Sequence, residues 1–78
     1  MNELCFFLVR SLDSPMEFYT IVVEGKRKSV EEDLKMFFVD VRFLKTLPLN
    51  SKDAYRYKGN RKLGDNIIRG CYYSRDFI

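Results

Sequence analysis

The sequence predicts an α+β fold: a single small domain in which one amphipathic helix packs on a small, mostly antiparallel sheet, in the order β-β-α-β-β. Two apolar runs separated by a turn signal open the chain, a helix-start pattern follows, and two more strand-like runs lie after Pro48. The 78 residues fit one domain, which we expect to span residues 1–78. Because 46% of them are hydrophobic and 15% are aromatic, even this short chain can build a core.

The first two strands are expected at residues 4–9 and 18–23. Leu4–Val9 is a continuous apolar run, typical of a strand that is covered on both faces. Phe18–Val23 is rich in β-branched and aromatic residues, which favour extended backbone. Between them, Asp13-Ser14-Pro15 predicts a turn, since proline fixes φ and short polar side chains bond the local backbone. We therefore expect an antiparallel hairpin that ends at Gly25.

A capping pattern predicts where the helix starts. In Ser29-Val30-Glu31-Glu32 the Ser29 hydroxyl can cap the first turn, while the Glu32 side chain three residues later reaches back to it. Glu31, Glu32 and Asp33 also lie where the helix dipole favours negative charge. We therefore expect the helix to begin at Ser29.

Two positions remain open for the end of the helix. In the shorter reading it ends near Asp40, and residues 41–47 form a further strand. In the longer reading it continues to Leu47, where Pro48 prevents continuation. The longer reading is favoured because no Gly, Pro or Asn interrupts residues 30–47. It also produces one apolar stripe at helical spacing, made of Val30, Leu34, Phe37, Val41 and Leu44.

The longer helix would carry a second apolar stripe, roughly opposite the first. Its members are Met36, Val39, Phe43 and Leu47. A helix that is apolar on two sides must bury both of them. Either the C-terminal segment folds over this stripe, or a protein partner or a second copy of the chain covers it. These four residues are therefore the candidate protein interface.

The C-terminal third predicts two more strands. In residues 54–58 the sequence alternates, which places Tyr55 and Tyr57 on one face and Arg56 and Lys58 on the other. Residues 67–73 form the last strand, with Gly70 as the position of a bulge. Turn residues at 59–60 and 64–66 separate the two strands.

The residue types that most catalytic sites need are scarce. The chain has no His, which excludes imidazole bases and His metal ligands, and two Cys cannot form a four-Cys zinc site. Cys5 and Cys71 are expected as small hydrophobic residues within strands; the alternative is a redox pair, which requires the terminal strands to be neighbours. Asp13, Glu24 and Lys26 have a spacing similar to that of some metal-dependent nucleases, but the polar end of a hairpin explains Glu24 and Lys26 more simply. We expect no enzyme, no metal and no cofactor.

No segment has the length of a membrane span. The longest uncharged apolar run, Leu4–Val9, is far shorter than the roughly 20 residues that a spanning helix needs. It also lacks a basic leader and a small-residue cleavage site. The sequence therefore favours a cytoplasmic protein without a membrane partner.

Charge is distributed unevenly between the two halves of the chain. Residues 1–40 hold five basic and eight acidic side chains, whereas residues 41–78 hold nine basic and three acidic ones. The overall net charge of +3 thus combines an acidic half with a strongly basic half. Such an asymmetry suggests that the basic half engages an anionic partner.

Tyrosines alternate with the basic residues in this half. Nucleic-acid binding uses both types, because Lys and Arg neutralise phosphates and aromatic faces stack on unpaired bases. Single-stranded or looped RNA exposes such bases better than a duplex does. The candidate binding residues are Lys52, Tyr55, Arg56, Tyr57, Lys58, Arg61, Lys62, Arg69, Tyr72 and Tyr73, with Arg75 beyond them. Tyrosines on the inner face of a strand, with solvated basic residues outside, would produce the same pattern.

The first half of the chain resembles a class of small bacteriophage proteins. A short strand from residue 4, a tight hairpin and the acidic helix start at residues 29–33 look like host-takeover and anti-defence proteins, over about residues 3–47. The basic segment from Lys52 onward lies outside the resemblance. It implies a short, non-enzymatic chain that acts as a stoichiometric inhibitor of host machinery in the host cytoplasm, through protein or RNA contacts.

Two functional hypotheses follow. In the first, the basic half binds RNA or a nucleic-acid-binding protein complex. In the second, the protein is an inhibitor or a homodimer that docks through the second helix stripe or through a sheet edge, without nucleic acid. Sheet-edge pairing uses main-chain groups, so the sequence carries little sign of it. Exposure of Met36 and Phe43 would favour the second hypothesis.

Overall fold

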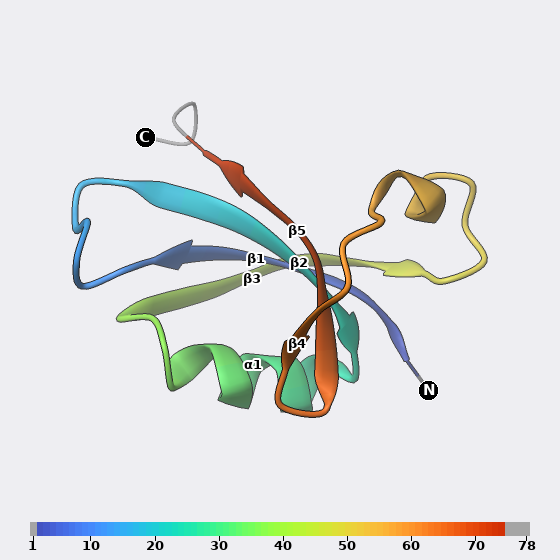
Figure 1. The fold of residues 1–78 in the computed structure, drawn as a ribbon, viewed down its shortest axis with the longest axis horizontal. Helices are drawn as coiled ribbons and strands as arrows, with labels where there is room; N and C mark the ends of the chain where they lie inside the picture. The colour runs from blue at the N-terminus through green and yellow to red at the C-terminus, as the bar shows by residue number, and fades with distance from the viewer. Residues whose placement is uncertain (1, 75–78) are drawn as a thin grey trace.

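The computed structural model of the chain describes residues 2–74 (Figure 1). Their elements follow one another as β1 (Glu3–Arg10), β2 (Phe18–Gly25), α1 (Arg27–Lys35), β3 (Asp40–Pro48), the short 3-10 helix η1 (Ala54–Arg56), β4 (Arg61–Leu63) and β5 (Asn66–Tyr73). The predicted α+β class with one α-helix is confirmed. The sheet holds five strands within this part of the chain, one more than the predicted order contained.

The strands form one antiparallel sheet in the order β3-β1-β2-β5-β4. The predicted hairpin of β1 and β2 is confirmed, with Phe6 opposite Val22 in its register. β3 pairs with the other edge of β1, and β5 pairs with the other edge of β2. β1 and β2 therefore lie inside the sheet, while β3 and the short β4 form its edges.

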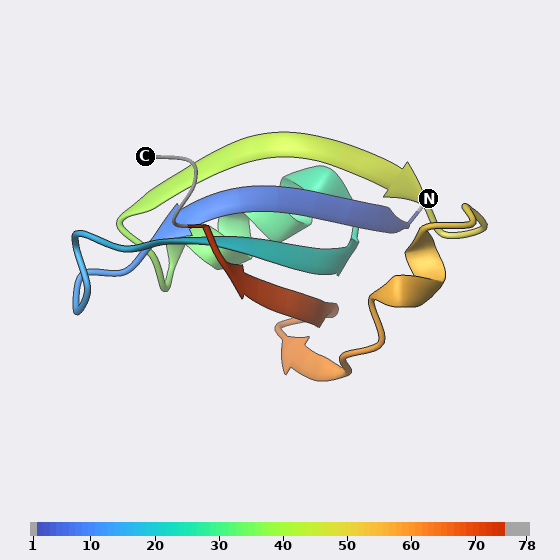
Figure 2. The same ribbon diagram turned by 90° about the horizontal axis from the view of Figure 1, so that it is seen from above.

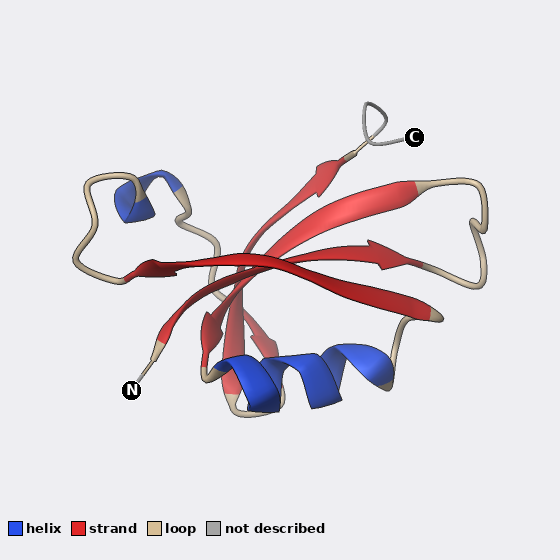
Figure 3. Cartoon of the chain, turned by 180° about the vertical axis from the view of Figure 1, so that it is seen from behind, coloured by secondary structure: helices blue, strands red, loops and turns tan. Residues whose placement is uncertain are grey.

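The helix covers one face of this sheet (Figure 3). Phe7 and Val9 of β1 point to that face and pack with Val30 and Leu34, the two buried residues of α1. Phe43 of β3 meets the ring of Phe7 edge-on at 5.6 Å between centroids. Every residue of the run from position 4 to position 9 is at most 7% exposed, so the prediction of a strand covered on both faces is confirmed.

The predicted capping box at Ser29 is wrong. The helix already begins at Arg27, after Lys26 in an extended conformation, and no side chain caps its first turn. Ser29 lies inside the helix, where its Oγ accepts a hydrogen bond from Asn66 Nδ2 at 3.1 Å. The same amide group donates to Asp33 Oδ2 at 2.7 Å. These two polar side chains of α1 thus bind the start of β5 instead of the helix's own backbone.

The helix also ends earlier than the favoured reading predicts. It stops at Lys35, and residues 40–48 form β3, as the shorter reading allows. The valines and aromatic residues of this segment favour extended backbone, and β1 offers it an unpaired edge to bind. Pairing between strands far apart in the sequence thus overrides the absence of a helix breaker. Leu44 is the extra residue of a bulge, because Phe6 lies opposite Lys45 and Phe7 opposite Phe43.

The C-terminal third is partly as predicted. The strand expected at residues 67–73 is confirmed as β5, and its bulge lies at Arg69, next to the predicted Gly70. The strand expected at residues 54–58 does not form, because this segment folds into η1 and an irregular stretch. β4 and β5 form a hairpin that turns through Gly64, whose φ of 61° favours glycine.

Leu34→Ala tests the helix-side core. Leu34 is fully buried, and removing such a side chain typically lowers the free energy of unfolding by about 2–5 kcal/mol. The measurement is equilibrium unfolding in urea. Leu12→Ala removes the same atoms from a residue that is 74% exposed, and we expect it to change stability by less than about 0.5 kcal/mol. Equal losses in both variants would contradict the packing of α1 on the sheet.

Candidate functional site

The sheet face opposite α1 carries no helix except the short η1 near one end (Figure 3). We call it the helix-free face, and define it by the outward residues of β1 (Leu4, Phe6, Leu8 and Arg10) and their cross-strand neighbours. Viewed from behind, α1 lies on one side of the sheet and η1 on the other, near one end only (Figure 3). The remainder of the face is formed by strand side chains alone.

Residues 49–60 cover the part of this face that is near Leu4 and Phe6. Ala54 and Tyr57 pack on the small core made of Leu4, Phe6 and Val22. The Tyr57 ring meets Phe6 edge-on at 5.2 Å and Tyr72 at 6.1 Å between centroids. A continuous aromatic contact therefore links β1, this covering segment and β5. Tyr72 is the last ring in this series of contacts and is 47% exposed.

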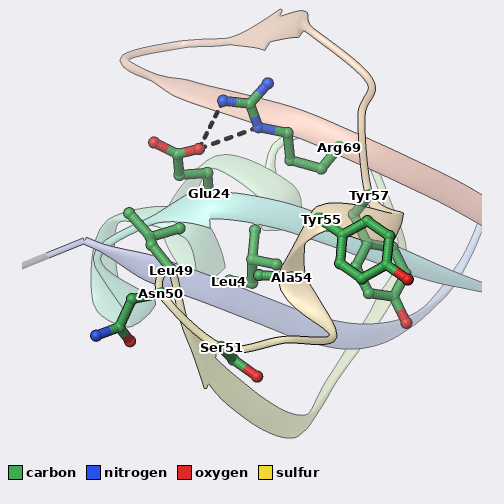
Figure 4. Close-up of a pocket in the computed structure, with 9 residues that line it drawn as sticks. All are labelled: Leu4, Glu24, Leu49, Asn50, Ser51, Ala54, Tyr55, Tyr57 and Arg69. Carbon is green, nitrogen blue, oxygen red and sulfur yellow. Dashed lines mark hydrogen bonds and ion pairs between the residues drawn. The ribbon is translucent and has the colours of Figure 1, made fainter.

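A cavity of about 320 Å³ lies between the covering segment and the sheet (Figure 4). Leu4, Ala54 and Tyr57 form part of its wall, and Glu24 and Arg69 form another part. Figure 4 shows the Arg69 guanidinium directed at the Glu24 carboxylate across the top of this view. The polar side of the cavity is thus already occupied by an internal ion pair.

Arg69 fixes the covering segment to the sheet. Its Nε and Nη2 donate to Glu24 Oε1 at 3.0 and 2.7 Å, and its Nη1 donates to the Gly59 carbonyl at 2.7 Å. The Gly59 N–H in turn donates to the Arg69 carbonyl at 3.0 Å. Both partners of the ion pair are about three-quarters buried or more. Arg69 therefore holds structure together, and its charge is neutralised.

Other cations of the helix-free face have no carboxylate partner. Arg42 and Lys45 lie opposite Leu8 and Phe6 in the β1–β3 register. The Lys45 ammonium lies 4.9 Å from the centre of the Phe6 ring. Ion pairs within residues 2–74 involve only Arg10, Lys35, Arg56 and Arg69 among the basic residues. Arg42 and Lys45 are both exposed, so their charges face the solvent uncompensated.

The predicted anionic-partner residues divide into two groups. Most lie on the helix-free face or on the segment that covers it, and these are Lys52, Tyr55, Arg56, Tyr57, Lys58, Lys62, Arg69 and Tyr72. Arg61 and Tyr73 do not. By the strand alternation Arg61 lies on the side of Ile68, which belongs to the helix-side core. Tyr73 lies opposite Tyr19, with ring centroids 5.7 Å apart. Arg75 lies outside the described residues.

Several of these residues are less available than the sequence suggests. Tyr57 is partly buried against Phe6, and Arg56 lies 4.0 Å from Asp53 in an exposed ion pair. Lys52, Lys58 and Lys62 are exposed and have no ion-pair partner in the described part of the chain. The predicted strand face of Tyr55 and Tyr57 does not exist, because η1 turns Tyr55 outward.

Sequence reasoning missed Arg42 and Lys45 as site residues. The favoured helix reading placed both on a helix, where they had no relation to the tyrosines. Read as a strand, residues 41–43 alternate between apolar and basic side chains. This alternation is the signal that could have placed Arg42 on a solvent-facing sheet surface.

The candidate protein interface is also different from the predicted stripe. Met36, Val39, Phe43 and Leu47 are not on one helix, since α1 ends before all four. Phe43 packs in the helix-side core and Leu47 against the core of the opposite face. Met36 and Val39 alone are strongly exposed. The prediction of a single docking stripe built from these four residues is therefore wrong.

The β3 edge of the sheet is poorly suited to pairing with a second copy. A bulge at Leu44 interrupts the regular pairing of β3 with β1, and the strand ends at Pro48. Arg42 and Lys45 project from the same strand. Bulges, basic side chains and proline are devices by which edge strands avoid pairing with another chain.

The thiol groups are not activated. Burial is the main cause that raises the pKa of Cys5 to about 11; the Glu3 carboxylate also raises it, and Arg27 opposes the shift. Burial raises the pKa of Cys71 as well. The two residues lie on β1 and β5 with β2 between them, and both are free thiols. A raised pKa disfavours the thiolate, which is the reactive form.

The described residues contain no group of three or more Cys, Asp and Glu side chains that could hold a metal ion. Asp13 lies in the loop before β2, whereas Glu24 lies near the far end of that strand and binds Arg69. The nuclease-like spacing in the sequence therefore does not produce a common site.

Comparison with protein-family models, with curated proteins and with solved structures found no match. No helix within residues 2–74 is long and apolar enough to cross a membrane.

Arg69→Met tests the tether of the covering segment. The change leaves the partly buried Glu24 carboxylate without its partner and releases Gly59, so we expect unfolding free energy to fall by about 1–3 kcal/mol. Urea unfolding measures it. Arg56→Met is the matched control, because its ion pair is long and exposed and should contribute less than about 0.5 kcal/mol. Similar losses in both variants would show that Arg69 does not hold the segment.

Proposed function

We propose that the protein is a small non-enzymatic binding protein whose helix-free face binds single-stranded RNA. The observation that carries this proposal is the presence of uncompensated cations and an exposed tyrosine on one sheet face. Arg42 and Lys45 lie on one edge of that face, Lys62 on the other, and Tyr72 between them.

The charges supply affinity without sequence preference. Arg42, Lys45 and Lys62 neutralise phosphates, and each contact releases counterions that had condensed on the RNA. Lys52 and Lys58, on the covering segment, extend the positive surface toward the end of the face near Leu4. Three acidic groups on this face or its covering segment, Glu24, Asp40 and Asp53, each pair with an arginine.

The aromatic side chains supply base contacts. Tyr72 is 47% exposed, and its ring meets that of Tyr57 in a T-shaped contact that fixes its orientation. Stacking of one base on such a ring contributes about 1–3 kcal/mol and tolerates any base. An unpaired strand presents its bases to a sheet in this way, whereas a duplex hides them. Single-stranded RNA is therefore favoured over duplex.

The resemblance to phage host-takeover and anti-defence proteins supports an inhibitory role for this binding. The protein would act stoichiometrically in the cytoplasm of a host cell, by occupying RNA or a nucleic-acid-binding protein complex. Neither a cofactor nor a metal takes part in this proposal.

Fluorescence anisotropy with a labelled single-stranded RNA of about 12 nucleotides tests the proposal. With about four phosphate contacts, affinity should fall about 50-fold between roughly 50 and 200 mM salt. The double variant Arg42→Glu/Lys45→Glu should lower affinity at least about tenfold, since it removes two contacts and adds repulsion. Tyr72→Ala should lower it by a further factor that does not depend on salt.

The matched control is Lys26→Glu/Lys28→Glu. It changes net charge by the same amount but lies at the start of α1, on the other side of the sheet, where both residues are exposed and unpaired in the described structure. Its affinity should stay within about threefold of the parent. An equal loss of affinity in both double variants would mean that net charge alone, and not the helix-free face, determines binding. Binding that does not depend on salt would also overturn the proposal.

A further inference from the structure

Two neighbouring connections at the end of the molecule opposite η1 carry exposed apolar side chains (Figure 1). The loop between β1 and β2 carries Leu12 and Met16, and the turn between α1 and β3 carries Met36, Phe37 and Val39. These two connections lie next to each other at the left of Figures 1 and 2. The five side chains are between 49% and 83% exposed. We call this surface the apolar end.

Arg10 joins the two connections of the apolar end. Its guanidinium donates to the Pro15 carbonyl at 3.3 Å and forms an ion pair with Asp40. Its own carbonyl accepts a hydrogen bond from the Val39 N–H at 2.9 Å. One residue thus binds the hairpin loop on one side and the start of β3 on the other, so the apolar side chains are carried on segments that are fixed to each other.

The surroundings of the apolar end are acidic. Residues 10–17 and 31–40 hold six acidic and two basic side chains. Both basic residues are paired within the chain, Arg10 with Asp40 and Lys35 with Glu31 at 3.0 Å. Asp13 and Glu32 are exposed, and no ion pair of the described structure involves them. Glu32 lies one helical turn before Met36, so a free carboxylate borders the apolar side chains.

We propose that the apolar end is a docking site for a basic amphipathic helix of another protein. The apolar face of that helix would cover Met16, Met36 and Phe37, and its Lys or Arg side chains would face Asp13 and Glu32. Exposed apolar patches with a polar rim are typical of interaction sites, and helices bind such surfaces through one apolar face. The negative charge of Asp13 and Glu32, which form the rim of this surface, favours a basic partner.

The same charge disfavours other occupants. A symmetric dimer through this end would bring the Asp13 and Glu32 carboxylates of both copies together, because an isologous interface apposes identical patches. An anionic membrane would repel them as well. The apolar end meets the helix-free face at Arg10 and Asp40, but the two proposals rest on different residues and are tested with different variants, so they can fail independently.

The test uses a fluorescent model peptide of about 18 residues, made of Leu and Lys in helical order, added to the full chain. A peptide of the same composition in scrambled order and a helical Leu/Glu peptide serve as controls. We expect the helical Leu/Lys peptide to bind at least about tenfold more tightly than either control. Equal binding of the scrambled peptide would mean that charge alone is recognised, and would overturn the proposal.

Two variants locate the site. Met16→Ser/Phe37→Ser removes apolar contacts. Asp13→Lys/Glu32→Lys reverses the charge of the two acidic residues that border them. Each variant should weaken peptide binding at least about tenfold. Leu49→Ser and Asp65→Lys are controls for the type of change, each made at a single exposed residue elsewhere on the surface. Met16→Ser/Phe37→Ser changes no charge and no proposed RNA-binding residue, so it should bind single-stranded RNA as the parent does. Unchanged peptide binding in both site variants would overturn the proposal.

Light scattering and vesicle flotation address the other occupants directly. A dimer that Met16→Ser/Phe37→Ser converts to monomer would assign the apolar end to a second copy of the chain. Binding to vesicles of phosphatidylserine, lost in the same variant, would assign it to a membrane. Either result would overturn the proposal, whereas a monomer that ignores such vesicles supports it.

Discussion

The rest of the structure depends on keeping both faces of β1 away from water. The run Leu4–Val9 is apolar throughout, so each of its faces needs a cover. α1 covers one face through Val30 and Leu34. The other is covered near Leu4 and Phe6 by a short irregular segment that Arg69 ties to the sheet, and around Leu8 by side chains of the neighbouring strands without a helix. The difference between a complete and a partial cover produces the asymmetry of the molecule.

This asymmetry also organises the charge. The acidic half of the chain supplies α1 and the hairpin end, while the basic half supplies an edge strand, the covering segment and the β4–β5 hairpin. Ion pairs neutralise Arg10 and Arg69, which hold connections in place, and leave Arg42 and Lys45 free. Arg42 and Lys45 therefore lie where the sheet has no helix over it, whereas Lys26 and Lys28, at the start of α1, remain unpaired within the described residues. The exposed side chains of Met16, Met36 and Phe37 lie at the acidic end.

Local sequence patterns predicted the elements that depend on local interactions. The β1–β2 hairpin and β5 were predictable, because apolar runs and a short turn determine them. The end of α1 was not, since residues 40–48 become a strand only when the edge of β1 is present to pair with them. Ser29 failed as a cap for a related reason, as its hydroxyl is used by Asn66, 37 positions later in the chain. The candidate site inherited these errors: most residues of the basic segment lie on or over the helix-free face, but Arg42 and Lys45 were missed and a helix stripe was expected that does not form.

The most direct test of this division between the two faces is a ¹H–¹⁵N NMR titration of the full chain with single-stranded RNA. The account predicts that the amide signals of Arg42, Lys45 and Tyr72 shift with increasing RNA, while those of Val30 and Leu34 on α1 stay in place. Shifts concentrated on α1, or no shift of the helix-free face at saturating RNA in low salt, would contradict it.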